Sequence, residues 1–346
     1  MTSRLHRTLT MVGVLIGTFV VRVIARLRPQ RWLTPSISLR LFRISSEPSS
    51  AITAAELRRH LPADGRRTRT DLVYAAGSGH DGRFDLVLPD GPGPHPLIIW
   101  LHGVGWHFGD KADALPYVEL LATRGFAGAV VNYPRAPRDH YPAAPRQVNE
   151  AVRHLLAHAT EYDIDPDRVV LAGESAGAQI AAELAALVTN PADAATTTLE
   201  PALTPAQLRG ALLFCGIFDP AGLVESNRMF EAVLESAMWS LARSRSWLDS
   251  ETCRLMTVVD HVTGEFPPTF LAAGNADPLT RRQTPPMAAR LHEAGVPVDE
   301  YYPGDDANPI NHEFQLRLAT PEGQEAFERA VAFLTRVMSP GPSISH

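Results

Sequence analysis

Short apolar runs alternate with helical stretches along most of this chain, and the alternation restricts the fold more than any other feature of the sequence. The runs that we predict as strands are Asp71–Ala75, Phe84–Leu88, Leu97–Leu101, Ala127–Asn132, Val169–Ala172, Ala211–Phe214, Thr269–Ala273 and Val298–Tyr302. The stretches that we predict as helices are Ala114–Arg124, Pro145–His158, Ala176–Val188, Pro285–Ala294 and Gly323–Val337. Because strands that alternate with helices are joined by crossover connections, we predict an α/β fold with a mostly parallel central sheet flanked by helices.

Two segments depart from this alternation. The first two strand runs are separated only by Gly77–Gly82, a glycine-rich turn, so we expect them to form an antiparallel hairpin. The stretch Phe218–Val262 has helical periodicity and contains no strand candidate. An insertion at this position lies above the carboxyl ends of parallel strands, where open α/β sheets bind ligands. We therefore interpret residues 218–262 as a helical cap.

The N-terminal segment differs in charge from the rest of the chain. Residues 1–46 contain eight Arg and no Asp or Glu, and removing these charges from the net charge of −6 leaves −14 on the other 300 residues. The uncharged run Leu9–Val21 is shorter than the about 20 residues of a transmembrane helix, and a basic start before such a run is typical of a signal peptide. We expect residues 1–30 to form a membrane anchor or surface helix. A cleaved signal peptide and a helix packed on the body are the alternatives.

Charge and cysteine content exclude several classes of protein. A net negative charge argues against the basic surface that nucleic-acid binding requires. Two cysteines, Cys215 and Cys253, build neither a disulfide scaffold nor a zinc site of several thiolates. Cys215 lies in an apolar strand run, so we interpret it as a buried thiol.

We interpret residues 31–68 as a linker with short helices that add to the cap. We interpret residues 69–346 as the α/β body.

The chemistry is concentrated at Gly173-Glu174-Ser175-Ala176-Gly177, which directly follows one predicted strand and opens the next predicted helix. Small residues on both sides of the serine allow the sharp turn of a nucleophile elbow, which exposes the hydroxyl at the end of the strand. The free N–H groups at the start of the following helix point toward an oxyanion formed there. A five-residue match alone fits an ordinary strand-to-helix turn equally well.

Three further segments favour the nucleophile elbow. The run Leu97–Leu101 ends in His102-Gly103-Val104-Gly105-Trp106, and a glycine-rich loop at that edge supplies backbone N–H groups to an oxyanion. We expect His102 to brace this loop. In chain order an acid and then a histidine follow the serine. Asp277 comes after the strand run at Thr269–Ala273, and His312 comes after the run at Val298–Tyr302, so both lie at the same sheet edge as Ser175.

These motifs resemble those of the hormone-sensitive-lipase-like family of α/β-hydrolase carboxylesterases. Five family motifs occur in order between residues 70 and 338: HGVGW (102–106), YPRAP (133–137) with YPAA (141–144), GESAGAQIAA (173–182), DPL (277–279) and HEF (312–314). The resemblance implies an α/β-hydrolase body at 69–346 and no metal or organic cofactor. It further implies the nucleophile Ser175, its partners Asp277 and His312, and an oxyanion hole formed by the N–H groups of Gly103, Val104 and Ala176.

The sequence departs from the family pattern at two positions. Val104 replaces the middle glycine of HGGGW, which matters if that position needs a backbone conformation that favours glycine. Glu313 stands where many relatives have glycine after the histidine, and it would raise the pKa of His312 if it turned inward.

Asp305 and Asp306 are rival candidates for the acid. They follow a different strand from Asp277, so we interpret them as a solvated loop.

We therefore expect a serine hydrolase that acts on small to medium acyl esters through an acyl-enzyme, with a small-molecule ester as its partner and no nucleic acid. An amidase or arylformamidase-type hydrolase would use the same residues. A catalytically silent, membrane-tethered binding protein is the third hypothesis. Because more arginines follow the run Leu9–Val21 than precede it, the expected location is the cytoplasmic face of a membrane, with export after signal cleavage as the alternative.

The N-terminal hypothesis is tested by cell fractionation. The full-length chain is expected to pellet with membranes, because the apolar run is flanked by arginines that contact anionic headgroups. A chain that starts at Trp32 is expected to leave the membrane fraction and to keep its esterase activity. A full-length chain with an intact N-terminus that stays out of the membrane fraction would contradict the anchor. An N-terminus mapped near Arg26 would establish export.

Overall fold

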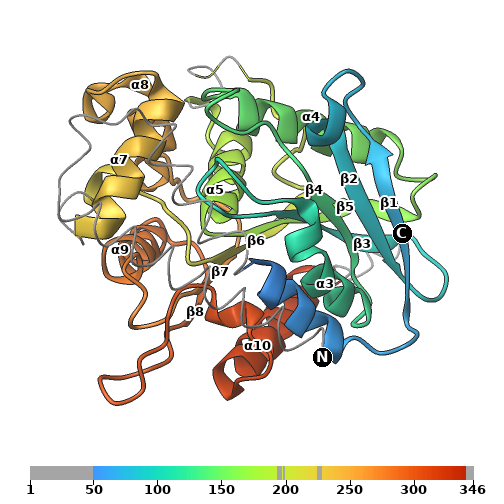
Figure 1. Ribbon diagram of the computed structural model, residues 1–346. Helices are drawn as coiled ribbons and strands as arrows, with labels where there is room; N and C mark the ends of the chain where they lie inside the picture. The colour runs from blue at the N-terminus through green and yellow to red at the C-terminus, as the bar shows by residue number, and fades with distance from the viewer. Residues whose placement is uncertain (1–49, 193–196, 198, 224–227, 340–346) are drawn as a thin grey trace, which may run out of the picture.

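The computed structural model describes residues 50–192, 197, 199–223 and 228–339, and its centre is an eight-stranded sheet in the order β1-β2-β4-β3-β5-β6-β7-β8 (Figure 1). The strands are β1 (Arg66–Val73), β2 (Arg83–Pro89), β3 (His95–Leu101), β4 (Ala127–Val131), β5 (Ile164–Glu174), β6 (Leu208–Phe214), β7 (Thr269–Ala272) and β8 (Val298–Tyr301). Strand β2 pairs antiparallel with β1 and with β4, and all other neighbours pair parallel. The predicted α/β fold, the parallel sheet and the N-terminal hairpin are confirmed.

Helices cover both faces of this sheet. They are α3 (Lys111–Ala122), α4 (Ala143–Ala157), α5 (Ala176–Thr189), α7 (Arg228–Ala242), α8 (Glu251–Met256), α9 (Thr280–Glu293) and α10 (Pro321–Val337). Buried side chains of α3 and α10 pack on one face of the sheet, and those of α4, α5 and α9 pack on the other. The molecule is therefore a three-layer α/β/α structure, and Figure 1 shows these layers around the twisted sheet.

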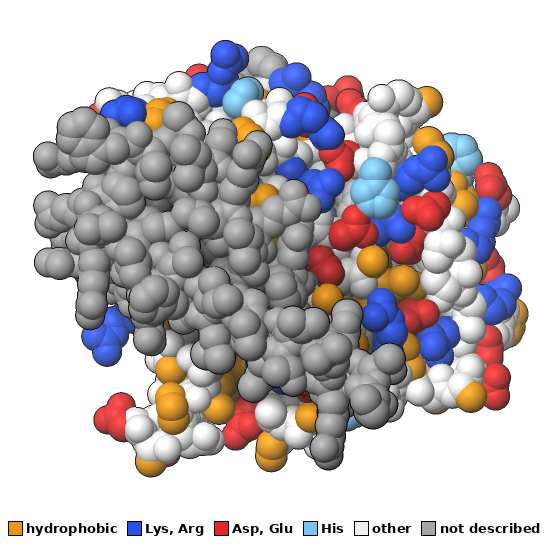
Figure 2. Space-filling model, viewed as in Figure 1, with side chains coloured by type: hydrophobic (Ala, Val, Ile, Leu, Met, Phe, Trp, Pro, Cys, Tyr) orange, Lys and Arg blue, Asp and Glu red, His pale blue; other side chains and the backbone are white. Residues whose placement is uncertain are grey.

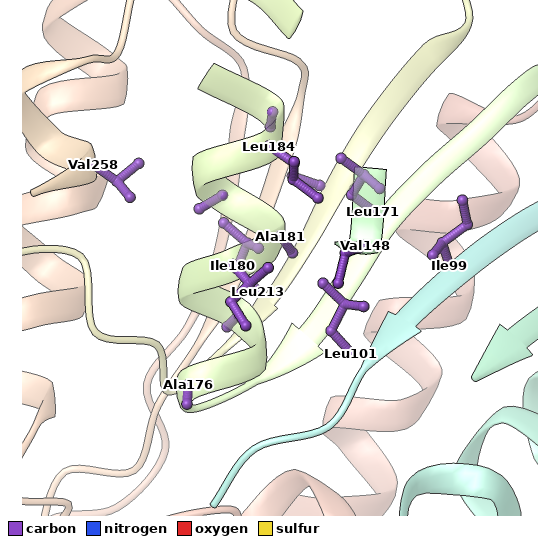
Figure 3. Packing of buried hydrophobic residues seen from close by; sticks show 14 of the residues in the cluster. Ile99, Leu101, Val148, Leu171, Ala176, Ile180, Ala181, Leu184, Leu213 and Val258 are labelled. Atoms are coloured by element: carbon purple, nitrogen blue, oxygen red, sulfur yellow. The ribbon is translucent and has the colours of Figure 1, made fainter. Parts of the chain in front are cut away.

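The central strands are apolar over most of their length because both of their faces are buried there. Along β3, Leu97, Ile99 and Leu101 join the core on the α5 side, while Ile98 and Trp100 join the core on the α10 side. Figure 3 shows the α5 side, where the side chains of this helix lie against those of the strands. This contact fixes α5, and with it the start of the helix at Ala176, against the ends of the central strands.

Four helices begin earlier than predicted from the sequence, and the difference is largest for α3 and α9. Helix α3 begins at Lys111 because Asp110 caps it: the Asp110 side chain accepts from the N–H of Ala112, and the side chain of Asp113 accepts from the N–H of Asp110. Helix α9 begins at Thr280 and contains Pro285 and Pro286 in its interior. The prediction treated this proline pair as the start of the helix, which placed the start too late.

The insertion between β6 and β7 contains α7 and α8, which pack against each other beside α9 (Figure 1). The end of α7 is joined to the segment before α4: the N–H of Tyr141 donates to the carbonyl of Leu241, 3.3 Å away, and Nδ1 of His140 lies 2.8 Å from the carbonyl oxygen of Ser240. Residues 50–57 are helical, in line with the short helix expected before the body. The predictions for residues 1–49 lie outside the described residues.

The surface of the described residues carries charges of both signs. On the face shown in Figure 2, Lys and Arg side chains alternate with Asp and Glu side chains over the described part of the view. Among the described residues, helices long and apolar enough to cross a membrane are absent. The location of the protein therefore stays a prediction.

Candidate active site

Ser175 occupies a tight turn between β5 and α5. Its backbone has φ 54° and ψ −118°, a conformation that non-glycine residues rarely adopt and that is found mainly at functional sites. The turn is possible because of the flanking glycines. A Cβ atom on Gly177 would lie 2.0 Å from the carbonyl oxygen of Leu101, and one on Gly173 would lie 2.7 Å from the same oxygen. The turn is therefore packed directly against the end of β3.

The structure brings Ser175, His312 and Asp277 together in a hydrogen-bonded row. Nε2 of His312 lies 3.1 Å from Oγ of Ser175, and Nδ1 lies 2.7 Å from Oδ2 of Asp277. Asp277 follows β7 and is buried, and its other carboxylate oxygen accepts from the N–H of Leu279 at 2.8 Å. This is the geometry of a nucleophile, a base and a group that orients the base.

Of the two rival carboxylates, Asp305 closes its own turn and Asp306 is exposed. Oδ1 of Asp305 accepts from the N–H groups of Ala307 and Asn308, so this side chain closes its own exposed turn. Asn275 was not among the residues predicted from the sequence. Its Oδ1 accepts from the N–H of Ile310, and its Nδ2 donates to the carbonyl of Asp305. Asn275 therefore ties the loop that carries His312 to the loop that carries Asp277.

The electrostatic environment of His312 favours its charged form. Burial by itself would lower the pKa of His312, but the adjacent Asp277 carboxylate outweighs burial, and the pKa stands well above its ordinary value. A raised pKa makes His312 a stronger base. It also means that a larger fraction of the imidazole is protonated, and so unable to accept a proton, at neutral pH.

Glu174, beside the serine, holds the loop that follows β3. Its carboxyl group is buried and accepts from Nε1 of Trp100 at 2.6 Å and from the N–H of Gly103 at 2.8 Å. Burial, followed by the charge of Glu313, raises the pKa of Glu174 well above its usual range. The N–H of Gly103, which was expected to contribute to the oxyanion hole, donates to the Glu174 carboxyl group in this structure. A Cβ at position 103 would be a tight fit, since it would lie 3.0 Å from the carbonyl oxygen of Glu174 and 3.2 Å from Cβ of Ser175.

The remainder of this loop has an unusual backbone. Val104, Gly105 and Trp106 all have positive φ, with a value of 69° at Val104. A β-branched residue in this region is strained, so the substitution noted in the sequence does place valine where glycine is preferred. Nε1 of Trp106 donates to Oε1 of Gln179 in α5 at 3.0 Å, which anchors the loop to the helix.

His102, which opens this loop, is fully buried. Its ring stacks on Tyr133 with the centroids 4.4 Å apart, and burial lowers its pKa to about 4. It is therefore neutral at physiological pH, as expected for a residue that supports the loop.

Cys215 is a buried neighbour of His312 and Asp277. It is buried, its Sγ accepts from Nε2 of Gln315 at 3.2 Å, and burial raises the pKa of the thiol. Potential metal-ligating atoms of Cys215, Asp277 and His312 lie within 4.8 Å of one another. The 2.7 Å hydrogen bond between Asp277 and His312 is too short for a zinc ion bonded to both atoms at about 2.0 Å in tetrahedral geometry, so these two groups are arranged to share a proton.

Comparison with known proteins agrees with this geometry. The BD-FAE family model matches residues 84–291, which is more than half of the chain. The chain belongs to the BD-FAE family of α/β-hydrolase carboxylesterases. The family expected from the sequence motifs is thereby confirmed.

Individual relatives match beyond residues 84–291. Esterase LipQ of Mycobacterium tuberculosis is 28% identical over 289 residues, which cover 80% of this chain and 64% of LipQ, so the match spans less than two thirds of that relative. The bacterial heroin esterase is 25% identical with a TM-score of 0.67, over 86% of this chain and 92% of that chain. Esterase B from Lactobacillus rhamnosis shares the fold, with a TM-score of 0.76 at 20% identity over 87% of this chain and 96% of that chain.

The pH dependence of activity tests the assignment of base and acid in this BD-FAE member. A histidine that acts as the base must be neutral, so we expect kcat/KM for ester hydrolysis to rise with pH and to reach half its maximum above the ordinary histidine pKa of about 6.5. Asp277→Asn should lower kcat by about 10⁴-fold, since the imidazole loses its orienting partner. The control Asp305→Asn should remain within a few-fold of wild type. A larger loss in Asp305→Asn would show that the acid is wrongly assigned.

The strain at Val104 predicts an unusual stability change. Val104→Gly should leave the free energy of unfolding unchanged or raise it by up to about 1 kcal/mol, because relief of the left-handed conformation offsets the greater freedom of glycine in the unfolded chain. Val298→Gly, at a partly buried strand position, should lower it by about 1 kcal/mol or more. Guanidinium unfolding measures both variants. Equal destabilisation of the two would refute strain at Val104.

Proposed function

We propose that this protein hydrolyses carboxylic esters through an acyl-enzyme on Ser175. The observation that carries the proposal is the placement of His312, with Nε2 at 3.1 Å from the serine oxygen and Nδ1 at 2.7 Å from Asp277. The strained turn at Ser175 supports it, since nothing in the packing of the core requires a serine hydroxyl in that conformation. Two of the compared proteins, LipQ and the bacterial heroin esterase, carry esterase in their names.

The proposed reaction has two stages that use the same groups. Oγ of Ser175 attacks the ester carbonyl while Nε2 of His312 accepts the hydroxyl proton, and the Asp277 carboxylate stabilises the imidazolium. His312 then donates this proton to the oxygen of the leaving alcohol. Water attacks the acyl-enzyme in the second stage, again with His312 as the base, and the acid is released.

The oxyanion hole that we propose consists of the N–H groups of Val104, Gly105 and Ala176. Ala176 opens α5, so its N–H has no partner within the helix. Among the described residues, the N–H groups of Val104 and Gly105 find no acceptor, whereas that of Gly103 is bonded to Glu174. Backbone donors fixed in this way stabilise the charge that develops on the carbonyl oxygen.

We propose that the substrates are esters of small to medium acids and that residues 218–262 act as a cap. A pocket beside the oxyanion loop supports the cap, since it is lined by Trp106 and Gln179 together with Leu241 of α7 and Met256 of α8. Val104 adds a branched side chain where the family pattern has glycine, and we expect this bulk to favour compact esters. An amidase with the same residues is the second hypothesis, and matched anilides distinguish it from an esterase.

The role of the serine is tested by Ser175→Ala. We expect turnover of p-nitrophenyl butyrate to fall by about 10⁴-fold or more without loss of the fold, because the hydroxyl supports no core packing. The control Ser246→Ala, at an exposed position in the cap segment, should keep full activity. Residual activity of Ser175→Ala within tenfold of wild type would remove the assignment.

The substrate range is tested with a series of p-nitrophenyl esters. Esters of C2 to C6 acids should be hydrolysed with a higher kcat/KM than esters of C12 to C16 acids, and Val104→Gly should widen the range of alcohols that the enzyme accepts. Faster turnover of the long-chain esters would contradict the expected range. Faster cleavage of matched anilides than of esters would favour the amidase.

A further inference from the structure

Glu313 directs its carboxylate into the active site. It follows His312 and has φ 58° and ψ 28°, a left-handed conformation that is uncommon for a residue other than glycine. Adjacent side chains on an extended chain point apart, but this turn places both on one side. Oε1 of Glu313 consequently lies 3.8 Å from Nε2 of His312, the ring nitrogen that faces Ser175.

This position corresponds to the alcohol side of a bound ester. In the proposed reaction Nε2 of His312 donates its proton to the leaving alcohol, so the alcohol oxygen must come within about 3 Å of Nε2. The carboxylate of Glu313 is almost as close to the same nitrogen. The first atoms of the alcohol beyond its oxygen must therefore pass beside Glu313.

The Glu313 carboxylate is available to a substrate. Its side chain keeps 31% of its surface exposed, and among the described residues His312 is its one hydrogen-bond or ion-pair partner, with no Lys or Arg beside it. In the state that accepts the serine proton His312 is neutral, and the other ionisable groups near Glu313, the Glu174 carboxyl and the Cys215 thiol, carry no positive charge. A partly enclosed acidic site of this kind attracts cations and repels anions.

We propose that Glu313 determines specificity by binding a positively charged group on the alcohol part of the ester. The favoured substrates are then esters of amino alcohols, in which an ammonium group lies two or three bonds beyond the ester oxygen. Esters whose alcohol carries a carboxylate or phosphate are disfavoured, because they would place two negative charges together. This inference rests on the proposed ester hydrolysis and adds the class of alcohol to it.

The test compares acetylcholine with its uncharged isostere, 3,3-dimethylbutyl acetate, in which carbon replaces the quaternary nitrogen. We expect wild type to have at least a tenfold higher kcat/KM for acetylcholine, and Glu313→Gln to reduce this ratio by about tenfold. Both esters are measured at one pH, so a change in the pKa of His312 affects both rates and cancels in the ratio. The preference should also weaken as ionic strength rises. Glu293→Gln, on the exposed end of α9, should leave both rates unchanged.

A binding measurement separates this inference from the proposed function. Calorimetry with choline should show about tenfold weaker binding to Glu313→Gln than to wild type and no change for 3,3-dimethylbutanol, whether or not the ester is turned over. The role of Glu313 would be overturned if wild type and Glu313→Gln had the same ratio of kcat/KM for acetylcholine to kcat/KM for 3,3-dimethylbutyl acetate. Equal affinity of the two proteins for choline would also overturn it. Absence of hydrolysis of both esters, with the choline difference intact, would instead count against ester hydrolysis alone.

Discussion

The contact between the serine turn and the end of β3 is the constraint on which the rest of the site depends. Gly173 and Gly177 pack against the carbonyl of Leu101 so closely that neither position has room for a Cβ atom. This contact holds Ser175 in its strained conformation and fixes the start of α5 at the same point. The nucleophile and the helix N-terminus are thus held by the packed core, which is how a rigid scaffold maintains a strained functional residue.

Glu174 extends this constraint to the oxyanion loop. One buried carboxyl joins the indole of Trp100, the N–H of Gly103 and, through the chain, the turn at Ser175. The loop is therefore positioned relative to the serine by hydrogen bonds, even though it carries a strained valine at position 104. A buried polar group that is fully bonded in this way restricts the loop to one arrangement.

The sequence was sufficient to predict the strands, the parallel sheet and the row of Ser175, Asp277 and His312, because apolar runs and chain order determine them. It did not predict the hydrogen bond of the Gly103 N–H, since the acceptor lies 71 residues away and becomes a neighbour of Gly103 only in the folded sheet. A signal did exist, because an acidic residue that ends a buried strand must find donors. The inward turn of Glu313 depends on the sign of one backbone angle, and neither motif nor periodicity specifies that sign.

The central claim is that Ser175 is the nucleophile and is activated by His312. The most direct measurement is mass spectrometry of the protein after treatment with a fluorophosphonate, which reacts covalently with activated serines. The structure predicts one adduct per chain, on the peptide that contains Ser175, and a large loss of labelling in His312→Ala. Labelling of a different serine, or full esterase activity in protein that remains unlabelled, would contradict this account.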